Sequence, residues 1–203
     1  MQNCSIVYKN ISLYRFIMNV IYGGSYRARF ELITRFVANN KISSVLELCF
    51  GDIIIAEYCK QRNINWKGID INPGFTEYAK KKGYDATCQD VLLVNSFHKS
   101  DICIMAGSLY HFKDHLDDIL KKVFEASPLF LISEPVKNLS SRKGLIGYIA
   151  RHSANIGKGA EEFRFNKQTF EEMLSQYSKK FNFEYQTLGH FKKDIVVVLN
   201  TSS

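Results

Sequence analysis

From residue 44 onward, hydrophobic runs of two kinds alternate along the chain. Short apolar runs predict strands over Ser44–Leu48, Trp66–Ile71, Asp85–Cys88, Asp101–Ala106 and Leu129–Ser133. Runs in which apolar residues recur three and four positions apart predict intervening helices over Ile54–Gln61, Gly74–Lys82 and Asp114–Ala126. Strands and helices that alternate in this way are typical of a parallel sheet covered by helices on both faces. We therefore expect an α/β fold with a doubly wound sheet.

Helical spacing also occurs on both sides of this alternating region. It predicts two N-terminal helices, from about Leu13 to Ile21 and from about Tyr26 to Ala38. Another helix is expected from about Lys167, followed by strands over Asn182–Leu188 and Asp194–Asn200. Because few residues separate these two strands, they must pair antiparallel.

The composition fits one folded domain. The 203 residues are 46% hydrophobic, which suits a chain with its own apolar core. The sequence contains no uncharged apolar run of the roughly 18–20 residues that a bilayer crossing needs, and no secretion signal, so we expect a cytoplasmic protein. Five cysteines, odd in number and without a CxxC pair, indicate reduced thiols rather than disulfides or a metal site.

Carboxylates follow three consecutive predicted strands. Glu47 and Gly51 lie where the first strand turns, Asp70 ends the second strand, and Asp90 follows the third. Since open α/β sheets bind ligands at the carboxyl ends of their strands, we expect these residues to converge. Asp70 is placed to accept hydrogen bonds from ribose hydroxyls, and Asp90 from an adenine amino group, with Val91 or Leu92 against the ring.

The turn after the first strand argues against a dinucleotide. A dinucleotide site uses a GxGxxG turn, whose backbone N–H groups hold the pyrophosphate, whereas Cys49–Ile53 reads CFGDI. Glu47 and Asp52 are also expected to repel phosphate groups. A ligand that carries an ammonium and a sulfonium group would be attracted by the same carboxylates. These residues therefore favour S-adenosylmethionine (SAM).

The segment Ser43–Pro135 resembles the core of class I SAM-dependent methyltransferases of the small, generic kind. Motifs that carry the resemblance are Val45–Gly51, Gly68–Asn72, Gln89–Val91 and Asp101–Phe112. The resemblance implies a seven-stranded, mostly parallel Rossmann-like sheet with a C-terminal antiparallel hairpin and an N-terminal helical cap. It implies SAM as cofactor, S-adenosylhomocysteine (SAH) as product and no metal. The cofactor-binding residues that it implies are Glu47, Cys49, Gly51, Asp70, Ile71, Asp90, Val91, Ala106 and Ser108.

The first motif differs from the family in its glycines. The family usually has Gly at the positions of Cys49 and Ile53, and this chain retains only Gly51. Ile53 is β-branched and is expected to open the following helix.

His111 is the first candidate for a catalytic residue. Methyl transfer from a sulfonium is an in-line displacement, which needs a general base only where the acceptor has a proton to lose. His111 lies just past the fourth predicted strand, where the resemblance implies residues that face cofactor and acceptor. An imidazole suits removal of a proton near neutral pH. Tyr110 is a second candidate, and a capping or packing role for His111 stays open.

The positive charge is concentrated in two segments. Of the net charge of +7, residues 1–46 contribute +5, from six basic residues and one acidic residue. Residues 136–159 also contribute +5, from five basic residues and no acidic one. The resemblance implies that these flanks build the acceptor pocket, so we expect an anionic acceptor. The candidate substrate-binding residues are Tyr26, Arg27, Glu134, Arg142 and Arg151.

The chain is therefore expected to be a single methyltransferase domain over residues 1–203. It would contain an N-terminal helical cap (1–42), a cofactor-binding core (43–135), a basic substrate-side insert (136–166) and a C-terminal helix and hairpin (167–203). The expected acceptor is an O or N atom of a small glycan, lipid or natural-product intermediate. RNA is an alternative, suggested by the isoelectric point of 9.1 but unsupported by RNA-methyltransferase motifs. Peripheral membrane contact, and a regulatory module without catalysis, also stay open.

Overall fold

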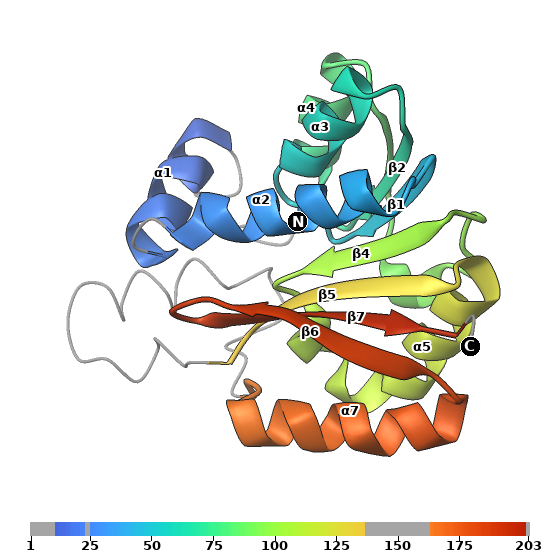
Figure 1. Cartoon of the computed structure of the whole chain (residues 1–203). Coiled ribbons are helices and arrows are strands. Elements are labelled where there is room, and N and C mark those ends of the chain that lie inside the picture. Colours follow the sequence, from blue (N-terminus) through green and yellow to red (C-terminus); the bar gives the residue numbers. More distant parts are fainter. Residues whose placement is uncertain (1–10, 23–24, 137–162, 202–203) are drawn as a thin grey trace.

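The computed structural model describes residues 11–22, 25–136 and 163–201, which contain one seven-stranded sheet (Figure 1). The strands are β1 (Ser44–Leu48), β2 (Asn65–Asp70), β3 (Asp85–Cys88), β4 (Ile102–Ala106), β5 (Leu129–Pro135), β6 (Glu184–His190) and β7 (Asp194–Asn200). Their order in the sheet is β3-β2-β1-β4-β5-β7-β6. β1 to β5 pair in parallel, whereas β7 runs antiparallel to both β5 and β6. The predicted α/β fold and terminal antiparallel hairpin are confirmed.

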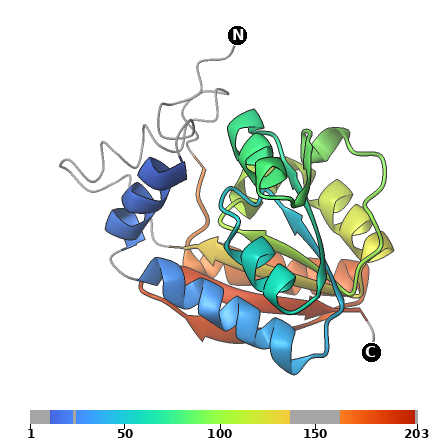
Figure 2. The same cartoon turned by 90° about the horizontal axis from the view of Figure 1, so that it is seen from above.

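Helices cover both faces of this sheet. They are α1 (Ile11–Tyr22), α2 (Ser25–Asn39), α3 (Ile54–Gln61), α4 (Pro73–Lys81), α5 (Leu116–Ala126) and α7 (Lys167–Phe181), with the 3-10 helices η2 (Val91–Leu93) and η3 (Leu109–His115). α2, α3 and α4 share a core with Val45 and Ile104, whereas α5 and α7 share one with Leu46 and Cys103. Figures 1 and 2 show α2 and α7 on opposite sides of the sheet. Because successive strand residues point to opposite faces, strands buried on both faces are continuously apolar.

The observed boundaries lie close to the predicted ones, and two differences have local causes. α5 begins at Leu116 instead of Asp114, because residues 109–115 form η3. β6 begins at Glu184 instead of Asn182, because Asn182 ends α7 in the left-handed conformation, with a φ of 51°.

The carboxyl ends of the parallel strands point to one edge of the sheet, and α1 lies on that side (Figure 1). Among the described helices, none has the length and apolar character needed to span a bilayer. In the same residues, no group of three or more His, Cys, Asp or Glu side chains is placed to hold a metal ion. Arg142, Arg151 and residues 137–162 of the predicted insert lie outside the described residues.

Candidate functional site

Asp70 joins the turns that follow β1 and β2. One carboxylate oxygen accepts a hydrogen bond from the Gly51 N–H at 2.9 Å, and the other accepts from the Asn72 N–H at 2.8 Å. The residue is 6% exposed, and burial raises the pKa of its carboxyl to about 6, although both N–H groups and the charge of His111 act in the opposite direction. Asp70 is thus a desolvated carboxylate that fixes two turns at the edge of the sheet.

The turn after β1 contains two left-handed residues. Cys49 has a φ of 54° and Gly51 a φ of 56°. This conformation suits glycine, and a residue with a Cβ adopts it at a cost of about 1–2 kcal/mol. Desolvation and the charges of Asp70 and Asp90 raise the pKa of the Cys49 thiol well above its usual value, while Ser108 acts in the opposite direction. The thiol is thus influenced by residues at the ends of β2, β3 and β4.

The turn accommodates Ile53 at the second position where the methyltransferase family usually has glycine. Its side chain is fully buried in the core shared by α2, α3 and α4. Its backbone has a φ of −87°, which any residue adopts, and it precedes the first residue of α3. The substitution therefore fills the core and imposes no left-handed strain.

Glu47 points into the core instead of standing as a charged side chain at the turn. Its side chain lies on the same face of β1 as that of Val45, and its Oε2 accepts a hydrogen bond from the Trp66 indole N–H at 2.8 Å. Burial raises the pKa of Glu47 well above its usual range. Because the side chain is fully buried and points away from the turn, the expectation that Glu47 would repel phosphates there does not hold.

Asp52 is likewise not a free negative charge. The Arg15 guanidinium of α1 donates to it from Nε at 2.9 Å and 3.0 Å and from Nη2 at 2.7 Å. The Tyr26 hydroxyl donates to the same carboxylate at 3.4 Å. The expected repulsion of phosphates by Asp52 is wrong, because Arg15 neutralises its charge. These bonds also tie α1 to the turn beside Gly51.

At the end of β3, Asp90 caps η2 by accepting a hydrogen bond from the Leu92 N–H at 3.0 Å. Val91 is 2% exposed and packs in the core under α5. Ile71, which follows β2, is half-buried. The Gln89 N–H donates to the Asp70 carbonyl at 3.0 Å, so the end of β3 lies beside the end of β2.

η3 presents the predicted catalytic pair at the end of β4. The Glu134 carboxylate, at the end of β5, accepts hydrogen bonds from the N–H groups of Leu109 at 3.1 Å and Tyr110 at 3.3 Å. The rings of Tyr110 and His111 lie 4.0 Å apart between centroids. Ala106 and Ser108, the other predicted residues here, are half-buried. Glu134 therefore holds η3 in place from the neighbouring strand.

The predicted acceptor residues are only partly assembled. Tyr26 is buried, with its hydroxyl on Asp52, whereas Arg27 is exposed on α2. Sequence reasoning missed Arg164, whose guanidinium carbon lies 3.3 Å from the centroid of the Tyr110 ring. The alternation of Phe163, Arg164 and Phe165 was the available signal, because it places the arginine opposite two aromatic residues.

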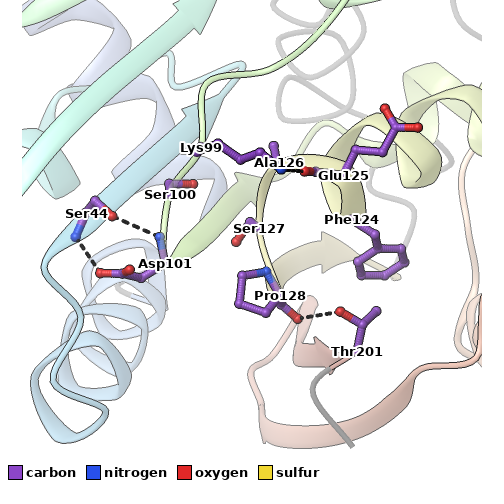
Figure 3. Close-up of a pocket in the computed structure, with 10 residues that line it drawn as sticks. All are labelled: Ser44, Lys99, Ser100, Asp101, Phe124, Glu125, Ala126, Ser127, Pro128 and Thr201. Atoms are coloured by element: carbon purple, nitrogen blue, oxygen red, sulfur yellow. Dashed lines mark hydrogen bonds between the residues drawn. The ribbon is translucent and has the colours of Figure 1, made fainter.

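The structure also contains a shallow pocket at the opposite edge of the sheet, where β1, β4 and β5 begin (Figure 3). Asp101 lies there and accepts hydrogen bonds from the N–H groups of Ser43 at 2.7 Å and Ser44 at 2.9 Å. These contacts, with the Ser43 hydroxyl, lower the pKa of Asp101. The carboxylate therefore joins β1 to β4, and the pocket lies away from the candidate site.

No family model matches this chain, and no curated protein matches it in sequence. Solved structures do resemble it. The plantazolicin methyltransferase BpumL, in complex with SAH and a pentazolic desmethylPZN analog, is 14% identical, with a TM-score of 0.68 over 96% of this chain and 92% of that one. Magnesium protoporphyrin IX methyltransferase from Synechocystis, with bound SAH, is 12% identical, with a TM-score of 0.66 over 96% of each chain.

A third similar structure is the methyltransferase domain of bacterial CtHen1. It is 14% identical, with a TM-score of 0.66 over 86% of this chain and 97% of that one. At such low identity, these likenesses establish the architecture. The chain has the class I SAM-dependent methyltransferase fold.

Proposed function

We propose that the chain is an enzyme that transfers a methyl group from SAM to an O or N atom of a small, anionic acceptor. The observation that carries the proposal is the pair of hydrogen bonds by which buried Asp70 holds the turns at Gly51 and Asn72. They fix a carboxylate beside a left-handed turn at the carboxyl edge of the sheet, where α/β folds bind nucleosides.

The residues around this turn fit SAM. Each Asp70 oxygen accepts one backbone hydrogen bond and has lone-pair capacity for a ribose hydroxyl. A Cβ on Gly51 would come within 3.2 Å of the Tyr14 hydroxyl, so glycine keeps space between the turn and α1. Asp90 adds a carboxylate near Cys49, which favours a positively charged ligand.

Within this proposal, Asp70 binds the ribose and Asp90 binds the adenine amino group. The adenine ring lies against Ile71 and Leu92, since the Val91 side chain is buried in the core, and the methionine part lies along Cys49, Gly51, Ala106 and Ser108. Glu47 supports the turn from the core, where it accepts the Trp66 hydrogen bond.

SAM, when bound, supplies a methyl group that is already activated by its sulfonium. His111 accepts the proton of an acceptor hydroxyl or ammonium at an imidazole nitrogen. Tyr110 lies against the His111 ring at 4.0 Å between centroids and so restricts its orientation. Glu134 acts as a positioning residue, because it accepts two N–H groups of η3.

The acceptor assignment rests on charge. The similar structures carry the names of unlike acceptors, such as plantazolicin and magnesium protoporphyrin IX, so the fold itself selects none. The net charge of +7 favours an anion. The same charge also supports RNA as a second candidate acceptor. RNA binding would weaken steeply as salt concentration rises.

Calorimetry with SAM and SAH tests the cofactor assignment. We expect binding by the wild type and strong weakening in Asp70→Asn, because one amide can accept only one of the two N–H groups and is neutral. Asp118→Asn, at an exposed carboxylate of α5, is the matched control and should bind normally. Absence of binding at millimolar SAM and SAH would exclude a methyltransferase. Binding without methylation of small acceptors or RNA would favour the regulatory module.

A further inference from the structure

We propose that Arg164 is a specificity-determining residue, which holds an oxyanion of the acceptor, a carboxylate or a phosphate, beside His111. This inference rests on the proposed function, since it names what the same site recognises. It starts from a cluster of three side chains around Tyr110. The Arg164 guanidinium carbon lies 3.3 Å from the Tyr110 ring centroid, and that centroid lies 4.0 Å from the centroid of the His111 ring.

Tyr110 is a fixed platform for both neighbours. It is 8% exposed, and its N–H donates to the Glu134 carboxylate at 3.3 Å. These two separations mean that the guanidinium carbon lies at most about 7.3 Å from the centroid of the His111 ring. An anion bound by Arg164 therefore lies one small molecule's length from the base that receives the acceptor proton.

The residues on either side of Arg164 are anchored. Phe165 is 4% exposed and packs edge-on against Phe170, with ring centroids 5.6 Å apart. The rings of Phe163 and Phe165 lie 5.0 Å apart between centroids, and the Lys113 ammonium of η3 lies 4.8 Å from the centroid of the Phe163 ring. The backbone that carries the guanidinium is thus held against η3 before any ligand binds, which lowers the entropy lost on binding.

The chemistry of this cluster favours an oxyanion. A guanidinium that lies over an aromatic face keeps its N–H groups around its rim, in a fork that matches carboxylate or phosphate oxygens. It has five N–H donors, so contacts with protein neighbours and a bidentate pair with an oxyanion can coexist. Lys113 adds a second positive charge through its contact with Phe163. Both cations would attract the anionic end of an acceptor whose other end reaches His111.

The test uses the full chain saturated with SAH, and inorganic phosphate and acetate as probes. The NMR signals of arginine Nε–H groups follow each titration, and Arg164→Ala assigns the relevant signal. We expect the Arg164 signal to shift saturably with at least one probe. Arg164→Ala should weaken binding of that probe about tenfold, and Arg164→Lys less, since lysine keeps the charge but loses the planar fork.

Arg62→Ala is the matched control. Arg62 also lies over a tyrosine, 5.6 Å from the Tyr58 ring centroid beyond the end of α3, and its removal should leave probe affinity unchanged. Equal probe affinity in wild type and Arg164→Ala, or no saturable shift with either probe, overturns the inference. Failure of the wild type to bind SAH overturns the proposed function instead. Arg164→Gln repeats the measurement if the alanine variant does not fold.

Discussion

Affinity for the cofactor should depend on pH through Asp70. Burial raises the pKa of its carboxyl to about 6. Only the ionised form can accept from the Gly51 and Asn72 N–H groups and from ribose hydroxyls on both oxygens, because protonation turns one oxygen into a donor. With that value, about ten of eleven cofactor-free molecules carry the charge at pH 7, and about one of eleven at pH 5. Protonation therefore competes with binding, and we expect the affinity for SAH to fall about tenfold between pH 7 and pH 5.

Calorimetry with SAH across this interval measures the effect. The α-amino group of SAH stays protonated there, so the ligand itself contributes no change of charge at that position. Asp70→Asn should bind weakly and without the pH dependence. His111→Asn should keep the pH dependence but move its midpoint upward, because the charge of His111 lowers the pKa of Asp70. An affinity of the wild type that stays constant from pH 5 to pH 7 would refute the placement of the ribose on Asp70.

Three further predictions concern stability. The pKa of Asp70 is higher in the folded protein than in the unfolded chain, so its contribution to stability is complete below pH 3.8 and is lost as pH rises through about 6. In urea unfolding without ligand, the unfolding free energy of Asp70→Asn should therefore rise by about 3 kcal/mol relative to that of the wild type between pH 3.5 and pH 7. A constant difference would contradict this sign. Arg15→Ala should lower the unfolding free energy by about 1.5–3 kcal/mol, since Asp52 is 1% exposed and loses its charged donor, while exposed Arg35→Ala serves as control. In the same assay, Cys49→Val should lower the unfolding free energy by about 1–2 kcal/mol. Cys49→Gly should stay within about 1 kcal/mol of wild type, because relief of the left-handed backbone strain offsets the conformational entropy of glycine. Equal stability of the two variants would show that the turn relaxes.

The fold was predictable because its signals are local. Strand and helix periods differ, so the alternation after residue 44 indicated both the elements and their parallel arrangement. The meeting of Gly51 and Asp70 followed from topology, since neighbouring parallel strands end at one edge. That inference required no knowledge of individual contacts.

Side-chain partners were less predictable, because they depend on how separate elements dock. Arg15 and Asp52 meet only after α1 packs beside the turn. The burial of Glu47 depends on Trp66, which a neighbouring strand supplies. Strand alternation did place Glu47 on the face of Val45, so its direction was available from the period of two. The stack of Arg164 on Tyr110 depends on the path of the chain into α7.

The position of β7 has a consequence for how the chain matures. β7 is the last described strand in the sequence, yet it lies between β5 and β6. While a nascent chain still lacks it, β5 has one open edge and β6 has no neighbour to join it to the sheet. An open strand edge is a template for pairing with another molecule. Until β7 pairs, the edge of β5 therefore stays open to association with another molecule, and pairing of β7 closes it.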